Sequence, residues 1–293
     1  MISFADALEA ALLADDRPVV TDFDIFRRAE TLLARRTWNG TPIKYVPGTW
    51  DVPRLHKTIA RLVARQALAA DNDFRSGVWR VIQATRAGTA EEVASIADPF
   101  CYVSHLSAMF RYGLTERSPA ALHLSTPARK IWNQMRDELL AGLTAAPEDA
   151  SDLLRHYGFK EKLRRRPVVL HETNRPAAPI QVRGEETRIA SVGDTFVDML
   201  AEPALCGGIH HVLDVWDRNA DQWLDEIISA VEKSDAKIVK VRAGYILSER
   251  MGIADTRISA WLAFAQRGGS RKLDPEAPYA PVYSESWMLS LNV

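Results

Sequence analysis

The sequence predicts an α+β fold in two parts, an N-terminal domain over residues 1–97 and a larger mixed α/β domain over residues 98–293. At 293 residues the chain is long enough for two ordinary domains, and 47% hydrophobic residues can supply a core to each. Helical periodicities alternate with short extended runs along the whole chain. Asp98-Pro99 is a turn signal between two such stretches and indicates the boundary.

The first elements are predicted from caps and periodicity. Residues 3–14 form a helix that a serine opens, and residues 18–20 are extended. Thr21 and Asp24 form a capping box with Asp in place of Glu, which begins a helix over about 22–36. Four apolar residues of this helix are expected to face the core: Phe23, Phe26, Leu32 and Leu33.

The connection over residues 37–51 is much longer than the three or four residues of a helix-turn-helix turn. Within it, residues 43–46 read as a strand between Gly and Pro residues. This strand could pair with the hairpin that follows later in the chain.

Residues 53–65 are predicted to form a basic amphipathic helix. Its cationic face spans an arc of about 80° and holds Arg54, Lys57, Arg61 and Arg65. A separate apolar stripe, wide enough to face a core, holds Leu55, Ile59, Leu62 and Val63. Like charges at i,i+4 destabilise a lone helix by about 0.2–0.5 kcal/mol per pair, so this face indicates a polyanionic partner. A solvated basic helix in any α+β domain is the alternative.

A short hairpin follows the basic helix. Residues 71–73 read as a turn, and residues 74–81 as a strand after it. A helix followed by a hairpin is the pattern of a winged helix-turn-helix domain, in which the helix enters the major groove and the wing contacts the backbone. Trp50 and Trp79 are expected to pack the hairpin against the helix, and the alternative is that they stack on a sugar.

Charge is unevenly distributed along the chain. Between Arg27 and Arg86 there are twelve basic and four acidic residues, a net charge of +8, whereas the whole chain carries −1. This segregation favours a polyanion-binding module joined to an acidic remainder.

The rest of the chain alternates between helices and short strands. Further helices are expected at 90–97, 100–113, 128–143, 193–201, 209–216, 219–233, 243–251 and 257–267. Further strands are expected at 122–125, 167–171, 180–183 and 237–241, before an extended closing segment over 268–293.

The DNA-binding candidates follow from these elements. The helix offers Arg54, Lys57, Thr58, Arg61 and Arg65, of which the first three lie nearest the end that usually meets base edges. The hairpin offers Arg75 and Arg80, and weaker candidates for backbone contacts are Lys44, Arg27 and Arg28. If about six of these cations neutralise phosphates, log K falls with log salt at a slope near −5.

A second basic run holds Lys160, Lys162, Arg164, Arg165 and Arg166. It could face an acidic protein or a tRNA-like molecule, extend a DNA footprint, or be a solvated helix end.

Other function classes find little support. The two cysteines, Cys101 and Cys206, fit a reducing cytoplasm, and no stretch of 18 apolar residues predicts a membrane span. None of the common nucleotide, metal or hydrolase motifs occurs, so we expect no catalytic residue, cofactor or metal. The alternative is a nuclease or nucleotide-modifying enzyme with an N-terminal winged domain. Its weak metal-binding candidates are Glu172, Asp194 and Asp198. A ligand-sensing transcription factor is a third interpretation.

Four stretches in order resemble the AbiEi-like antitoxins of the AbiE toxin–antitoxin systems. Residues 98–126 resemble the segment after the winged domain, with its "YVS…SAL…GLTE" pattern, and residues 76–81 resemble the "GVYRV" hairpin with Trp for Tyr. Residues 189–216 resemble the "ERTLLDLL…P…GGI.EV" block, and residues 241–253 resemble the closing "RLGYLLE" helix.

The resemblance implies a two-part type IV antitoxin. Its N-terminal winged domain would bind inverted repeats in its own promoter and repress the operon. Its C-terminal domain would counteract a nucleotidyltransferase-like toxin without the need for a stable complex. The sequence departs from the family in the long connection 37–51, in Val192-Gly193-Asp194 where Glu-Arg is usual, and after residue 254.

Overall fold

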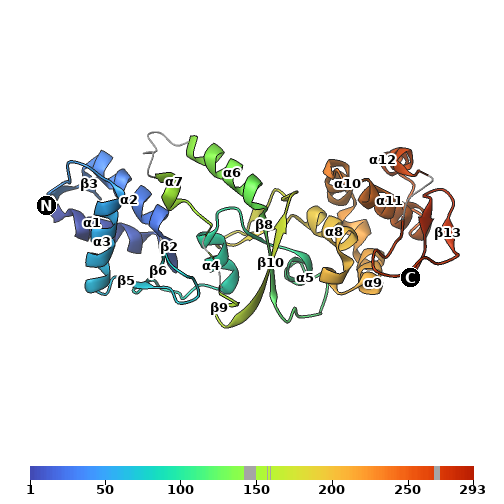
Figure 1. Cartoon of the computed structure of the whole chain (residues 1–293), viewed down its shortest axis with the longest axis horizontal. Helices are drawn as coiled ribbons and strands as arrows, with labels where there is room; N and C mark the ends of the chain where they lie inside the picture. Colours follow the sequence, from blue (N-terminus) through green and yellow to red (C-terminus); the bar gives the residue numbers. More distant parts are fainter. Residues whose placement is uncertain (142–149, 157, 159, 267–270) are drawn as a thin grey trace. The chain divides into compact units, whose positions relative to one another are not determined.

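The computed structural model describes residues 1–141, 150–156, 158, 160–266 and 271–293, and its fold is mixed α+β (Figure 1). Internal contacts divide the chain into two compact units. Unit 1 comprises Met1–Tyr102, Thr126–Pro176 and Gln181–Arg188. Unit 2 comprises Val103–Ser125, Ala177–Ile180 and Ile189–Val293.

These units differ from the predicted division at residue 97, because residues 126–176 lie in the same unit as the N-terminal hundred. Compactness and function are separate properties, so the functional division into 1–97 and 98–293 stays a prediction.

Unit 1 contains most of the strands. Its helices are α1 (Phe4–Ala14), α2 (Asp22–Arg35), α3 (Val52–Ala64), α4 (Ala90–Ala97), α6 (Arg129–Ala141) and α7 (Ala150–Leu153). Its strands are β1 (Ile2–Ser3), β2 (Val19–Thr21), β3 (Thr37–Trp38), β4 (Thr41–Lys44), β5 (Leu68–Ala70), β6 (Val78–Val81), β9 (Lys162–Leu163) and β10 (Arg166–Thr173). The chain passes between the units within β7 (Tyr102–Val103), β8 (Leu122–Pro127), β11 (Ile180–Gln181) and β12 (Arg188–Ile189).

Unit 2 is mainly helical. Its α-helices are α5 (His105–Arg111), α8 (Val192–Ala201), α9 (Ile209–Asn219), α10 (Leu224–Lys233), α11 (Lys237–Gly244) and α12 (Thr256–Ala260). It also contains three 3₁₀ turns, η1 (Pro203–Cys206), η2 (Ala220–Trp223) and η4 (Trp261–Phe264), and the π-helix η3 (Tyr245–Arg250). Two short strands close it, β13 (Tyr283–Ser284) and β14 (Leu289–Ser290).

The predicted caps are confirmed. The Ser3 hydroxyl accepts a hydrogen bond from the Asp6 N–H at 3.2 Å at the start of α1. At the start of α2, the Thr21 hydroxyl accepts from the Asp24 N–H, and the Asp24 carboxylate accepts from the Thr21 N–H at 2.8 Å. Both caps satisfy amides that a helix start would otherwise leave unpaired.

Helices α1, α2 and α3 pack together with a small antiparallel sheet of order β2-β6-β5. In its register, Trp79 of β6 lies opposite Val20 of β2 and Ala70 of β5. Phe26 and Leu32 are buried in this core as predicted, and Phe23 and Leu33 are partly buried against it.

The connection before α3 holds a second hairpin, and the predicted pairing of its strand with the later hairpin is wrong. The strand is β4, and it pairs parallel to β1, with Ile2 opposite Ile43, and antiparallel to β3. Asn39 and Gly40 form the turn with positive φ angles of 47° and 79°, as an Asn-Gly hairpin turn requires. Ile43 is 8% exposed and belongs to the core of α1–α3, so core burial selected the partner.

Two predicted elements after residue 97 are also wrong. Residues 237–241, predicted as a strand, begin helix α11, and the helix predicted from residue 100 starts at His105, after the short strand β7. The pattern of residues 237–241 predicted a strand because α11 is buried on several sides, so its apolar residues do not form the single stripe that indicates a helix. Arg242 is 5% exposed there and donates to the Leu200 and Lys272 carbonyls. Burial lowers its pKa to about 10.

Gly193 lies at the close contact between α8 and α10. A Cβ at this position would lie 2.3 Å from the Glu226 carbonyl oxygen and 3.0 Å from Ala230 Cβ. Helix α8 therefore packs against the backbone of α10 at a distance that only glycine allows.

We predict that Gly193→Ala lowers the free energy of unfolding by about 1–3 kcal/mol, because the new methyl group meets backbone that cannot rotate away. Chemical denaturation measures the change. Gly48→Ala is the control, since nothing lies within 4 Å of its added Cβ. An unchanged stability in Gly193→Ala would contradict the close packing.

Candidate nucleic-acid interface

Helix α3 starts at an N-cap and a proline. The Asp51 carboxylate accepts a hydrogen bond from the Arg54 N–H at 2.9 Å, and Pro53 lies in the first turn. Proline is tolerated there because the first amides of a helix have no partner within it. The cap fixes where the helix begins, and therefore which residues share a face.

One face of α3 is buried in the core of unit 1. Leu55, Ile59 and Leu62 are 0%, 3% and 0% exposed, as the predicted stripe requires. Val63 is 38% exposed, so its place in the stripe was wrong: at 180° it lies at the far edge of the arc, beyond the reach of the core. Thr58, which we predicted as a DNA-binding residue, is buried, so its side chain is not on the exposed face that holds the cations.

The opposite face presents the cations. Arg54, Lys57 and Arg61 are exposed and have no ion pair within the described ranges. Arg65 differs, because its guanidinium lies 2.5 Å from Asp6 and 3.7 Å from Glu9 on α1. Hydrogen bonds from Ser3 and Arg65 lower the pKa of the Asp6 carboxyl, which keeps this pair charged.

The hairpin β5–β6 follows α3 and packs beside it. Trp79 donates its indole N–H to Asp22 at 2.7 Å, and Trp50 packs edge-on against Phe4 at a ring distance of 5.5 Å. Both tryptophans are partly buried against the core of unit 1. These contacts join them to α1 and α2, so they do not test the predicted packing of the hairpin against α3. Arg80, next to Trp79, is exposed on β6.

The loop of this hairpin, residues 71–77, is clamped by the second basic run. The Arg164 guanidinium lies 2.8 Å from Asp71 and 2.5 Å from Asp73. The backbone adds two bonds, from the Lys160 N–H to the Asp73 carbonyl and from the Arg75 N–H to the Gly158 carbonyl. Burial opposes the charge of Arg164, but the two carboxylates outweigh it and raise its pKa.

The clamp divides the second basic run. Arg164 pairs with the hairpin loop, and Arg166 pairs with Glu91 at 2.9 Å. The other three cations are exposed: Lys160, Lys162 and Arg165. The run is not a helix end, because it contains β9 and the start of β10.

The weaker backbone candidates differ in their charge partners. Arg27 pairs with Glu30 at 2.6 Å, and Arg28 pairs with Asp15. Lys44 is exposed on β4.

Arg35 and Arg36, which we did not select as candidates, are exposed at the end of α2 with no ion pair in the described part of the chain. Their position in a cationic stretch was the signal that could have identified them.

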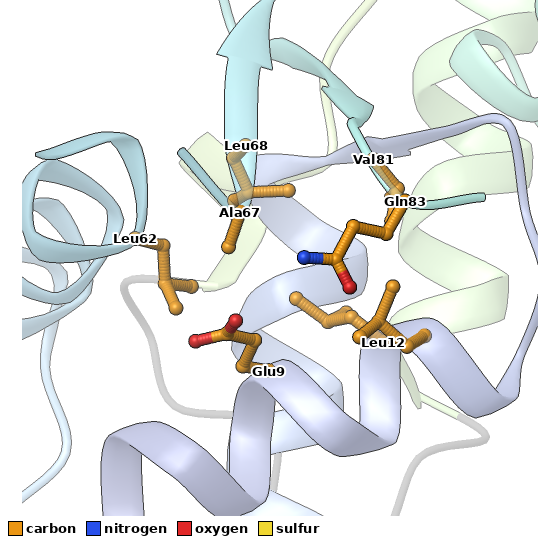
Figure 2. Close-up of a pocket in the computed structure, with 8 residues that line it drawn as sticks. Glu9, Leu12, Leu62, Ala67, Leu68, Val81 and Gln83 are labelled. Atoms are coloured by element: carbon orange, nitrogen blue, oxygen red, sulfur yellow. The ribbon is translucent and has the colours of Figure 1, made fainter. Parts of the chain in front are cut away.

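A small hollow lies between α1, the end of α3 and the hairpin β5–β6 (Figure 2). Its volume is about 10 Å³, and its lining is Glu9, Leu12, Leu13, Leu62, Ala67, Leu68, Val81 and Gln83. This space is at the lower limit for a single water molecule, so it offers no room for a sensed ligand.

The acids of the alternative enzyme interpretation do not form a cluster. Asp194 accepts a hydrogen bond from the Ser191 hydroxyl at 2.6 Å at the start of α8, where an acidic side chain is stabilised by the helix dipole. Within the described ranges, no three His, Cys, Asp or Glu side chains are grouped to hold a metal ion.

The described helices are too short or too polar to cross a bilayer. Both cysteines are buried and unpaired with each other, and burial raises the pKa of each thiol.

No known protein family matches the sequence, and no curated protein matches it. Among solved structures, the chain is similar to the "Crystal structure of RV2827C protein from Mycobacterium tuberculosis". The identity is 16% and the TM-score is 0.47, over 98% of this chain and 90% of that chain. A similarity this distant carries no conclusion about function.

We predict that Arg164→Ala lowers the free energy of unfolding by about 1–3 kcal/mol, because it leaves the buried Asp71 carboxylate without its charged donor. Urea denaturation measures the change. Arg165→Ala, an exposed cation next in the chain, should change stability by about 0.5 kcal/mol or less. If the two variants unfold alike, the clamp is not stabilising.

A second prediction concerns Asp198. Burial raises the pKa of its carboxyl from 3.8 to about 6, so the folded state binds more protons than the unfolded state between these values. The wild-type free energy of unfolding therefore falls as pH rises through this window. Asp198→Asn should be more stable than wild type at pH 8, by about 1–2 kcal/mol, and no more stable below pH 4. Equal pH profiles in denaturation would refute the raised pKa.

Proposed function

We propose that this protein is a DNA-binding transcriptional regulator whose reading surface is the exposed face of α3. The observation that carries the proposal is that Arg54, Lys57 and Arg61 share one exposed helix face without ion pairs in the described ranges. Free arginine and lysine side chains on a helix provide both phosphate contacts and bidentate contacts to guanine.

The topology of unit 1 supports a winged helix in this role. Helix α1, strand β2, helices α2 and α3, and the hairpin β5–β6 follow one another, and the sheet order is β2-β6-β5. This order is compatible with a winged helix-turn-helix domain, in which α3 would be the recognition helix and β5–β6 the wing. The β3–β4 hairpin is an insertion where the short turn is usual.

The neighbourhood of the hairpin supports a wider footprint. The Arg164 clamp holds the second basic run against the hairpin loop, so the exposed Lys160, Lys162 and Arg165 belong to the same unit as α3. Of the alternatives left open for this run, extension of the DNA footprint has this support. Arg80 and these three cations would then contact phosphates, which fix position and carry no sequence information.

We expect Arg61→Ala to weaken binding to the DNA upstream of the gene by about tenfold and to reduce the salt slope by about one. Fluorescence anisotropy at several salt concentrations measures both. Two controls remove one positive charge elsewhere: Arg28→Ala, whose cation is paired with Asp15, and Arg250→Ala, whose cation is paired with Asp217. Equal losses in all three variants would contradict recognition by α3.

We propose further that the protein acts as an antitoxin, and this part rests on the resemblance of the ordered sequence blocks to AbiEi-like proteins. The DNA surface and the neutralising surface would then be separable. Triple replacement of Arg54, Lys57 and Arg61 by Ala should abolish operator binding and leave neutralisation of the adjacent gene product intact in co-expression. If cells that express the adjacent gene product alone show no toxicity, the antitoxin role is refuted.

A further inference from the structure

The insertion between α2 and α3 carries its own group of exposed cations. Arg35 ends α2, Arg36 is the C-cap residue of that helix, and Lys44 ends β4. All three side chains are exposed, and none forms an ion pair within the part of the chain that the structure describes. Residues 35–46 contain no acidic residue, so these charges have no compensating charge close by in the sequence.

The pairing of the β3–β4 hairpin brings the three cations together at its base. The Ile43 N–H donates to the Arg36 carbonyl at 3.0 Å, so Arg36 adjoins the residue that precedes Lys44. The Asn39-Gly40 turn lies at the opposite end of the hairpin. Like charges gathered at one end of a hairpin repel one another, and a polyanion removes that repulsion.

The hairpin is held on the core of unit 1. Ile43 is buried in the core that also buries one face of α3, and Trp38 is partly buried against it. On the other side of β4, the parallel pairing with β1 places Lys44 opposite Ser3. The cations therefore lie on a preformed element, which binds at a lower entropic cost than a mobile one.

The same anchoring places the base of the hairpin beside the start of α3. Ser3, opposite Lys44, is followed by Phe4, which packs edge-on against Trp50 at a ring distance of 5.5 Å. Asp51 then caps α3. The N-terminal end of a recognition helix is the end that usually meets base edges. An element beside that end is in position to meet the DNA backbone that borders the groove.

Tyr45 projects from the base of the hairpin. It follows Lys44, is 89% exposed and has a φ angle of 55°. The left-handed region is disfavoured for a side chain of this size, and Tyr45 belongs to neither core cluster of the described residues. A strained backbone that holds an aromatic ring in solvent is typical of a residue with a contact role.

We propose that the base of the β3–β4 hairpin is a second DNA-contacting element, which binds the sugar-phosphate backbone beside the groove that α3 enters. Arg35, Arg36 and Lys44 neutralise phosphates, and the Tyr45 hydroxyl donates to a phosphate oxygen. Such contacts add affinity and fix position without carrying sequence information. The inference rests on the proposed DNA-binding function and assigns a role to the insertion that replaces the short turn.

Fluorescence anisotropy of the full chain with the duplex upstream of the gene tests this contact. At about 0.1 M salt, the double variant Arg35→Gln/Lys44→Gln should bind about tenfold more weakly than wild type. The slope of log K against log salt should become shallower by about two. The ratio of affinities for this duplex and a random duplex should stay the same, because backbone contacts do not distinguish bases.

The matched control is Lys233→Gln/Lys237→Gln. It also removes two exposed cations without ion pairs in the described ranges, but from α10 and α11 of unit 2. Its affinity and salt slope should stay close to those of wild type. If the control loses as much affinity as Arg35→Gln/Lys44→Gln, the inference is overturned, because the effect then reflects net charge alone.

Tyr45→Asn separates the contact from folding. Asparagine adopts the left-handed region more readily than tyrosine, so the variant should unfold at the same temperature as wild type or a higher one. Its DNA affinity should nevertheless fall by about threefold to tenfold. An unchanged affinity would overturn the contact assigned to Tyr45.

Arg61→Ala in the same assay keeps this inference apart from the proposed function. If Arg61→Ala weakens binding and the hairpin variants bind as the control does, the hairpin contact is overturned and recognition by α3 stands. If the hairpin variants weaken binding and Arg61→Ala does not, the hairpin contact stands and recognition by α3 is wrong. If wild type does not bind the duplex, the proposed function fails, and the hairpin contact fails with it.

Discussion

The burial of one face of α3 is the constraint on which the candidate interface depends. Leu55, Ile59 and Leu62 lie in the core formed with α1 and α2, so the helix cannot rotate about its axis without exposing them. Each such side chain contributes about 1.5–3 kcal/mol when buried, which far exceeds the repulsion among the cations opposite. The core therefore forces Arg54, Lys57 and Arg61 outward, where a polyanion can compensate their charge.

Charge compensation within unit 1 then selects which cations remain available. Arg28 and Arg65 pair with acids of the first sixteen residues, and Arg86 pairs with Glu92. The net charge of the stretch overstates its attraction for DNA, because part of it is neutralised by acids outside that stretch. The unpaired cations on α3 gather on one face, and this local concentration matters more for recognition than the total.

The Arg164 clamp connects the two basic regions that are far apart in the sequence. An arginine with two carboxylates and two backbone bonds beside it leaves the hairpin loop little freedom. A preformed loop binds at a lower entropic cost than a mobile one.

Local sequence patterns predicted the caps of α1 and α2, the amphipathic division of α3, the hairpin after it and the helix over Ala90–Ala97. These follow from neighbours within a few residues, which periodicity and caps record directly. Long-range packing was needed to establish that residues 237–244 form a helix and that β4 pairs with β1. It also determined that Thr58 is buried, that Val63 is exposed, and which arginines are paired. Each of these depends on segments distant in the sequence, such as the packing of Trp287 against Gly244, and no local pattern contains that information.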